Sequence, residues 1–170
     1  MMHRFGRGPG RADSRIHSQE MTAMSNTVRL HRVVATTPEK LYRAFIEPDA
    51  LAKWLPPDGF TCTVHHLDAR VGGTHRMSFR NFTTGHSHAF GGSYLELVPH
   101  QNIRYTDRFD DPGLPGEMVV TVTLEPTPLG TDLHIEQAGI PDAIPLAACY
   151  LGWQHSLKNL AALVEPDIKQ

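Results

Sequence analysis

The chain has 170 residues, of which 40% are hydrophobic and 20% charged, and its formal net charge is -2. This composition is that of one globular domain, long enough to fold around a hydrophobic core without disulfides. A nucleic-acid-binding role would need a strongly basic face, and no apolar run approaches the roughly 20 residues of a membrane-spanning helix. We therefore expect a cytoplasmic protein with no nucleic-acid and no membrane partner.

Residues 1–26 have no periodic apolar pattern, and they lack the continuous apolar stretch of about seven residues that a secretory signal needs. We interpret them as a disordered N-terminal arm that precedes a single domain over residues 27–166. The two cysteines, Cys62 and Cys149, lie far apart and in no metal-binding spacing. Both are expected to be reduced, buried side chains.

The domain is predicted to begin with a strand from Thr27 to Val34. The sequence Thr36-Thr37-Pro38-Glu39 is then typical of a helix start, with a threonine cap, proline at the first helical position and an early acid. This helix is expected to end at Pro48. A second short helix follows, and it is expected to stop at Pro56-Pro57.

From Phe60 onward the apolar period changes from 3.6 to 2 residues, which predicts six successive strands: Phe60–Asp68, Thr74–Asn81, His86–Val98, Asn102–Asp110, Met118–Glu125 and Asp132–Ala138. The gaps between them are too short for crossovers, so the sheet is expected to be antiparallel. Gly91-Gly92 within the third of these strands predicts a bulge or bend.

The last segment is predicted to be an amphipathic helix between Pro145 and Pro166, because its apolar residues recur at steps of three and four. One strand, two short helices, six strands and a long helix make an α+β fold. The helix is expected to cover the apolar face of the antiparallel sheet.

Several strings resemble, in order, a known protein family: Thr37–Phe45, Leu51–Pro57, Leu67–Gly73, Gly92–Leu97, Arg104–Thr106 and Gly152–Leu160. Over residues 28–165 the chain is similar to the AHSA1-like branch (homologues of the activator of Hsp90 ATPase) of the SRPBCC, or START/Bet v 1-like, superfamily. The resemblance implies a helix-grip fold, in which a curved antiparallel sheet of about seven strands wraps a long C-terminal helix.

The same resemblance implies a cavity between sheet and helix, which members use for lipids, polyketides and other apolar molecules. Some relatives are cyclases, aromatases or hydrolases. The co-chaperone that names the branch also carries a separate N-terminal domain, which residues 1–26 cannot supply. That departure counts against direct contact with Hsp90.

Ten side chains are predicted to point between sheet and helix and to contact a small apolar ligand: Phe79, Phe90, Tyr105, Asp107, Leu133, Ile135, Gln137, Tyr150, Trp153 and Leu157. The alternative is that they fill a solid core. Asp107 and Gln137 favour a cavity, because a buried polar group without a partner costs roughly 1–3 kcal/mol. Facing inward, they are either paired or line a space for water or for polar ligand atoms.

Metal binding is not expected. His86 and His88 are the only candidates, since they lie two apart on a strand and project from one face. A zinc site needs a further ligand, and the sequence does not bring His75, Asp107 or His134 to them. We assign no cofactor and no catalytic residue; Asp107, paired with a pocket histidine, is the candidate general base.

The sequence therefore leaves three functions open. The first is a small-molecule-binding protein for a hydrophobic or aromatic ligand, without catalysis. The second is a hydrolase-like or cyclase-like acid–base enzyme of the same fold. The third is a chaperone-interacting module that works through an exposed sheet face. A homodimer is left open.

Overall fold

The computed structural model describes residues 26–170, so the predicted arm lies outside the described residues except for its last position. The described part contains seven strands and three helices, in the order β1 (Val28–Val34), α2 (Pro38–Ile46), α3 (Pro48–Trp54), β2 (Phe60–Leu67), β3 (Thr74–Asn81), β4 (Ser87–Val98), β5 (Asn102–Phe109), β6 (Met118–Thr127), β7 (Gly130–Ala138) and α4 (Leu146–Val164). The predicted α+β plan is confirmed.

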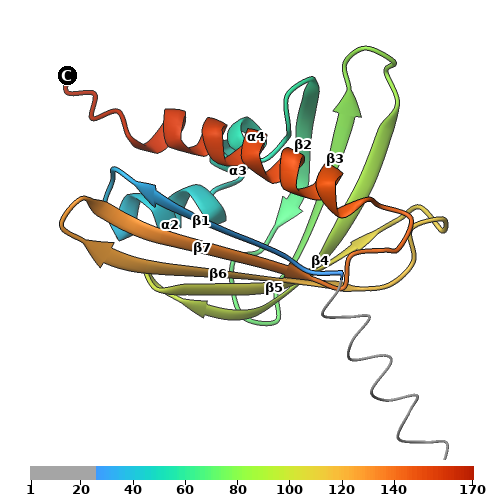
Figure 1. Cartoon of the computed structure of the whole chain (residues 1–170), viewed down its shortest axis with the longest axis horizontal. Helices are drawn as coiled ribbons and strands as arrows, with labels where there is room; N and C mark the ends of the chain where they lie inside the picture. Colours follow the sequence, from blue (N-terminus) through green and yellow to red (C-terminus); the bar gives the residue numbers. More distant parts are fainter. Residues whose placement is uncertain (1–25) are drawn as a thin grey trace, which may run out of the picture.

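The strands form one sheet in the order β1-β7-β6-β5-β4-β3-β2, and every neighbouring pair is antiparallel. Figure 1 shows the sheet curving beneath α4, which lies across its concave side, while α2 and α3 lie near the C-terminal half of that helix. This is the helix-grip arrangement. No helix of residues 26–170 is long and apolar enough to cross a membrane.

The start of α2 follows its sequence signals. Thr37 caps the helix, since its Oγ1 accepts a hydrogen bond from the Lys40 backbone N–H at 3.3 Å, and Pro38 occupies the first turn. Trp54, at the end of α3, is fully buried and donates its Nε1–H to Ala44 O at 2.8 Å. The two short helices are thereby joined, and together they fill one end of the space between sheet and α4.

The main core lies at this end. Its buried residues include Leu133 and Ile135 from β7 and Leu157 from α4, which pack with Leu41 and Trp54. All three of those sheet and helix residues were expected to contact a ligand. They lie instead in the buried core beside α2 and α3.

The turn at Asp68–Gly73 brings the ends of β2 and β3 together. Arg70 Nε donates to Asp68 Oδ2 at 2.6 Å, and a Cβ at Gly73 would lie 2.2 Å from Asp68 O, so only glycine fits there. The β6–β7 hairpin is tighter than expected: both strands extend to the pair Thr127 and Gly130. Cys62 and Cys149 are free as expected, although both are half-buried rather than buried.

Candidate ligand-binding pocket

A pocket of about 420 Å³ lies between the N-terminal half of α4 and the part of the sheet that α2 and α3 do not cover. Its lining comes from strands β2 to β7, α4 and the loops around them: Leu55, Pro57, Phe60, Met77, Phe79, His88, Phe90, Tyr105, Asp107, Phe109, Met118, Val120, Gln137, Ile144, Ala148, Cys149, Gly152, Trp153 and Ser156. This size is within the range of small-molecule sites.

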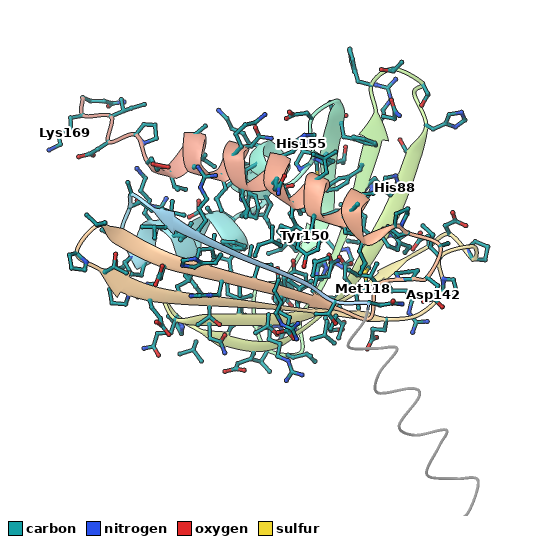
Figure 2. All side chains as sticks on the ribbon, in the orientation of Figure 1. His88, Met118, Asp142, Tyr150, His155 and Lys169 are labelled. Carbon is teal, nitrogen blue, oxygen red and sulfur yellow. The ribbon has the colours of Figure 1, made fainter. Side chains whose placement is uncertain are left out.

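Five rings on β2, β3, β4 and β5 form an aromatic wall, which we define as Phe60, Phe79, His88, Phe90 and Phe109. Neighbouring ring centroids are 4.8 to 6.5 Å apart, mostly edge to face. Burial lowers the pKa of His88, and the charge of Asp111 opposes this shift only in part. The lowered pKa favours a neutral imidazole in the wall. Figure 2 shows His88 beside the N-terminal half of α4. The wall offers flat apolar surface to a ligand.

The helical side of the pocket is one face of α4, with Ala148, Cys149, Gly152, Trp153 and Ser156 at successive turns. A Cβ added to Gly152 would meet nothing within 4 Å, so this glycine leaves open space at the middle of the face. Burial raises the pKa of the Cys149 thiol, which makes it a poor nucleophile.

Two of the polar lining groups are paired within the protein. Trp153 Nε1–H donates to Gln137 Oε1 at 2.8 Å, and the Gln137 amide nitrogen lies 3.3 Å from Met118 Sδ. Ser156 Oγ lies 2.6 Å from Leu55 O and 3.0 Å from Gly152 O. These groups hold α4 to the sheet and to the end of α3, and they present little free hydrogen-bonding capacity to the pocket.

Asp107 is the one carboxyl group in the described lining of the pocket. It is on β5, its side chain is 13% exposed, and it accepts a hydrogen bond from the Arg108 backbone N–H at 3.2 Å. His75 on β3 lies behind it, with a side chain 1% exposed and Nε2 at 3.7 Å from Asp107 Oδ1. Neither ring nitrogen of His75 has a hydrogen-bond partner among the described residues.

The position of this pair depends on Gly92. His75 pairs with Gly92 on β4, and the flanking pairs Gly91–Arg108 and Tyr94–Tyr105 place Asp107 opposite Gly92 on the other side. A Cβ at Gly92 would lie 2.0 Å from Thr106 O, so no side chain can stand there. The predicted irregularity at Gly91-Gly92 is therefore a close approach of strands, across which His75 and Asp107 meet.

Electrostatics at this corner follow from burial. Burial raises the pKa of Asp107, and the nearby His75 imidazole opposes that shift. Burial also raises the pKa of Tyr105 far above its usual range, with the Asp107 charge acting in the same direction. The Tyr105 ring lies 5.3 Å from that of His75. The corner is thus a low-dielectric site in which a carboxyl group and an imidazole lie 3.7 Å apart.

The structure brings many of the predicted ligand-contacting residues together and separates others. The pocket lining contains Phe79, Phe90, Tyr105, Asp107, Gln137 and Trp153. Tyr150 lies outside it, because its hydroxyl faces β1 and accepts a hydrogen bond from the Arg29 backbone N–H at 3.3 Å (Figure 2). The ligand-binding role of these residues stays a prediction.

Sequence reasoning missed several lining residues although a signal was present. Met77 precedes Phe79 by two residues and Phe109 follows Asp107 by two, so the strand period places each on the same face as its predicted neighbour. Cys149 precedes Trp153 by four residues on the helix. Phe60 and Ile144 carried no such signal, since only the fold places those strand and loop ends beside α4.

The two histidines named as metal candidates take different positions. His88 is part of the aromatic wall, whereas His86 is exposed in the turn before β4. Within residues 26–170, ligand atoms close enough to share an ion occur instead at His31, Asp132 and His134. That group lies on β1 and β7, where Leu133 between the last two residues faces the core, so it is on the opposite face of the sheet from the pocket.

A curved antiparallel sheet closed by a C-terminal helix is the fold of the SRPBCC superfamily. The chain belongs to its AHSA1-like branch: the family model described as activator of Hsp90 ATPase homolog 1-like protein matches residues 35–165. No curated protein matches the chain.

Several solved structures are similar to this chain. A protein from Chromobacterium violaceum is 66% identical, with a TM-score of 0.84 over 85% of this chain and 100% of that one. A protein from Mesorhizobium loti is 30% identical, with a TM-score of 0.62 over 81% and 95%. The AHSA1-like protein from Aeromonas hydrophila, 19% identical with a TM-score of 0.66 over 80% and 90%, shares the fold.

Proposed function

We propose that this protein binds a small apolar or aromatic molecule in the pocket between α4 and the sheet. The observation that carries the proposal is the pocket itself: about 420 Å³, lined almost throughout by apolar and aromatic side chains, with the Asp107 carboxyl at one corner. Binding sites for small organic molecules have this composition, with much apolar surface and a few polar groups that orient the ligand.

The shape of the lining indicates the kind of ligand. The aromatic wall on one side and the Trp153 ring on the other offer flat contacts, so a planar molecule of ring size would be enclosed by stacking and edge contacts. Two free cysteines fit a reducing compartment, and we propose the cytoplasm as the place where binding occurs.

The test uses N-phenyl-1-naphthylamine, a neutral aromatic dye whose fluorescence rises in apolar surroundings, together with native mass spectrometry of freshly purified protein. Wild-type protein should bind the dye, or carry a co-purified small molecule that the dye displaces. Gly152→Leu places a side chain into the open middle of the pocket and should abolish binding. Ala147→Leu is the matched control, because Ala147 is an exposed α4 residue outside the lining. Dye binding that is absent from the wild type, or unchanged in Gly152→Leu, would exclude the proposal.

A second function, acid–base catalysis, is favoured by one observation. A carboxyl group at the pocket surface lies 3.7 Å from a buried imidazole, and a carboxyl whose pKa is raised by burial is suited to proton transfer. Hydrolysis of 2-naphthyl acetate tests it: turnover above the buffer rate that Asp107→Asn abolishes and the exposed control Asp110→Asn retains would establish catalysis. No turnover by the wild type leaves ligand binding as the function.

The chaperone-interacting alternative lacks a specific observation of this kind. The large exposed apolar side chains lie on separate elements, for example Val33 on β1, Phe82 after β3 and Leu151 on α4. An interaction surface would gather such side chains into one patch.

A further inference from the structure

The polar corner of the pocket defines the chemical class of the ligand more closely than its apolar surface does. Resting on the proposed binding function, we infer that the ligand presents a hydrogen-bond donor, a hydroxyl or a protonated amine, to Asp107. Molecules that would place a carboxylate or phosphate there are rejected. Fatty acids and other organic anions should therefore not bind in this pocket.

Gln137 and Ser156, two of the polar groups in the lining, already have partners within the protein. Gln137 accepts from Trp153 and contacts Met118, and Ser156 is bonded to main-chain oxygens. A ligand that competed for these groups would have to break contacts that hold α4 in place. This leaves the Asp107 carboxyl, beside the Tyr105 hydroxyl and the His88 ring, to meet the polar atoms of the ligand.

The charge of the lining also disfavours an anionic ligand. In the part of the chain that the structure describes, no lysine or arginine lines the pocket, and His88, the one imidazole in the lining, has its pKa lowered by burial. An anionic group would enter this low-dielectric space without a counter-charge, beside a carboxyl group that repels it when ionised. A neutral donor meets no such penalty, and a cationic donor meets a counter-charge when Asp107 is ionised.

Asp107 and His75 are incompletely hydrogen-bonded within the described residues. The Asp107 carboxyl accepts one main-chain hydrogen bond, at 3.2 Å, and His75 Nε2 at 3.7 Å is too far for a second. Each oxygen of a carboxylate can accept two. The carboxyl therefore retains hydrogen-bonding capacity that a donor on the ligand would satisfy.

His75 acts through Asp107, because it lies behind the lining and does not reach the pocket. Its imidazole lies 3.7 Å from the Asp107 carboxyl, on the side away from the pocket. In this role His75 is a positioning residue, and Asp107 makes the contact with the ligand.

The experiment compares three probes that share one ring system: 2-naphthol, 2-naphthylmethylamine and 2-naphthoate. Each is titrated against protein loaded with N-phenyl-1-naphthylamine, and displacement is followed by loss of dye fluorescence. The naphthol or the amine should displace the dye at about tenfold lower concentration than the naphthoate, as one hydrogen bond to a charged group would give. Preference for the amine indicates an ionised Asp107, and preference for the naphthol a protonated one.

In Asp107→Asn the advantage over naphthoate should disappear, while Asp110→Asn, the exposed control, should retain it. A wild-type protein that binds naphthoate as well as the other two probes, or a preference that survives in Asp107→Asn, overturns the inference. So does a dye that binds but is displaced by neither donor. If the dye itself does not bind, the proposed binding function is contradicted. Failure of that function can thus be distinguished from failure of the inference about the hydrogen-bond donor.

Discussion

His75 and Asp107 lie in line across β4, with Gly92 between them, and the shortest distance between imidazole and carboxyl is 3.7 Å. Residues on two strands that flank a third are ordinarily separated by the side chain on the middle strand. Here the middle position cannot carry one, because Thr106 O would lie 2.0 Å from its Cβ. The polar corner of the pocket can thus form only because residue 92 is a glycine.

Gly92→Ala should lower the free energy of unfolding by about 3 kcal/mol, toward the upper end of the range for overpacking, because the new methyl group meets backbone rather than a movable side chain. The measurement is urea-induced unfolding followed by fluorescence. A loss below about 0.5 kcal/mol, the size expected at an unconstrained surface site, would show that β4 and β5 can separate freely.

Gly152→Ala should have the opposite effect and raise the free energy of unfolding by about 0.5–1 kcal/mol. Gly152 lies within α4, where alanine is the better helix former, and its Cβ would meet nothing within 4 Å. The same urea titration measures it and serves as the control for Gly92→Ala. A destabilised variant would mean that the helix side of the pocket is more tightly packed than the structure indicates.

Asp107→Asn should stabilise the protein increasingly as the pH rises. Burial raises the pKa of Asp107 in the folded state, so its contribution to stability is fully present below the unfolded pKa of about 3.9 and is lost as the pH rises through the folded pKa. The groups facing it are His75, Tyr94 and Tyr105. Unfolding free energies of wild type and variant should therefore converge near pH 4 and separate by pH 7.

The matched control is Asp110→Asn, for which the sign reverses. The hydrogen bond from Arg76 lowers the pKa of Asp110, so that carboxyl stabilises the fold above its unfolded pKa and the contribution is lost as the pH falls. The Asp110→Asn variant should have a lower free energy of unfolding than the wild type at pH 7, and the same free energy of unfolding in acid. Parallel pH profiles for the two variants would contradict the assignment of Asp107 as a buried acid.

His75→Phe, made in the Asp107→Asn background, should leave the free energy of unfolding unchanged or raise it by about 1 kcal/mol. Phenylalanine keeps the shape of the buried ring and removes two nitrogens that have no partner within the described residues. His75→Ala in the same background should lower it, because it leaves a cavity beside Tyr94 and Tyr105. If phenylalanine proved as damaging as alanine, a bound water or other partner at His75 would be implied.

The order of elements could be predicted from the sequence because the signals are local. Thr37 and Pro38 start α2, and the change from a period of 3.6 to a period of 2 near Phe60 marks the beginning of the sheet. Short turns between strands allow only antiparallel neighbours. Caps, periods and turns depend on residues a few positions apart, which is why the fold class and most strand limits agree with the structure.

The pocket could be predicted only in part. Strand alternation indicated that Tyr105, Asp107 and Gln137 face inward, and helical spacing did the same for Trp153. The same rules could not distinguish Leu133 and Leu157, which face inward but lie under α2 and α3 in the filled half of the fold. Alternation gives the face of the sheet, whereas the position of the short helices decides which part of that face is empty.

By itself the sequence determined the elements, their antiparallel order and the inward face of each strand, because these follow from backbone geometry and apolar spacing over short distances. Tertiary structure alone decided that His75 and Asp107 meet across Gly92, that Phe60 joins the aromatic wall, and that Tyr150 turns to β1. Those contacts join residues up to 121 positions apart, and their geometry depends on the curvature of the whole sheet beneath α4.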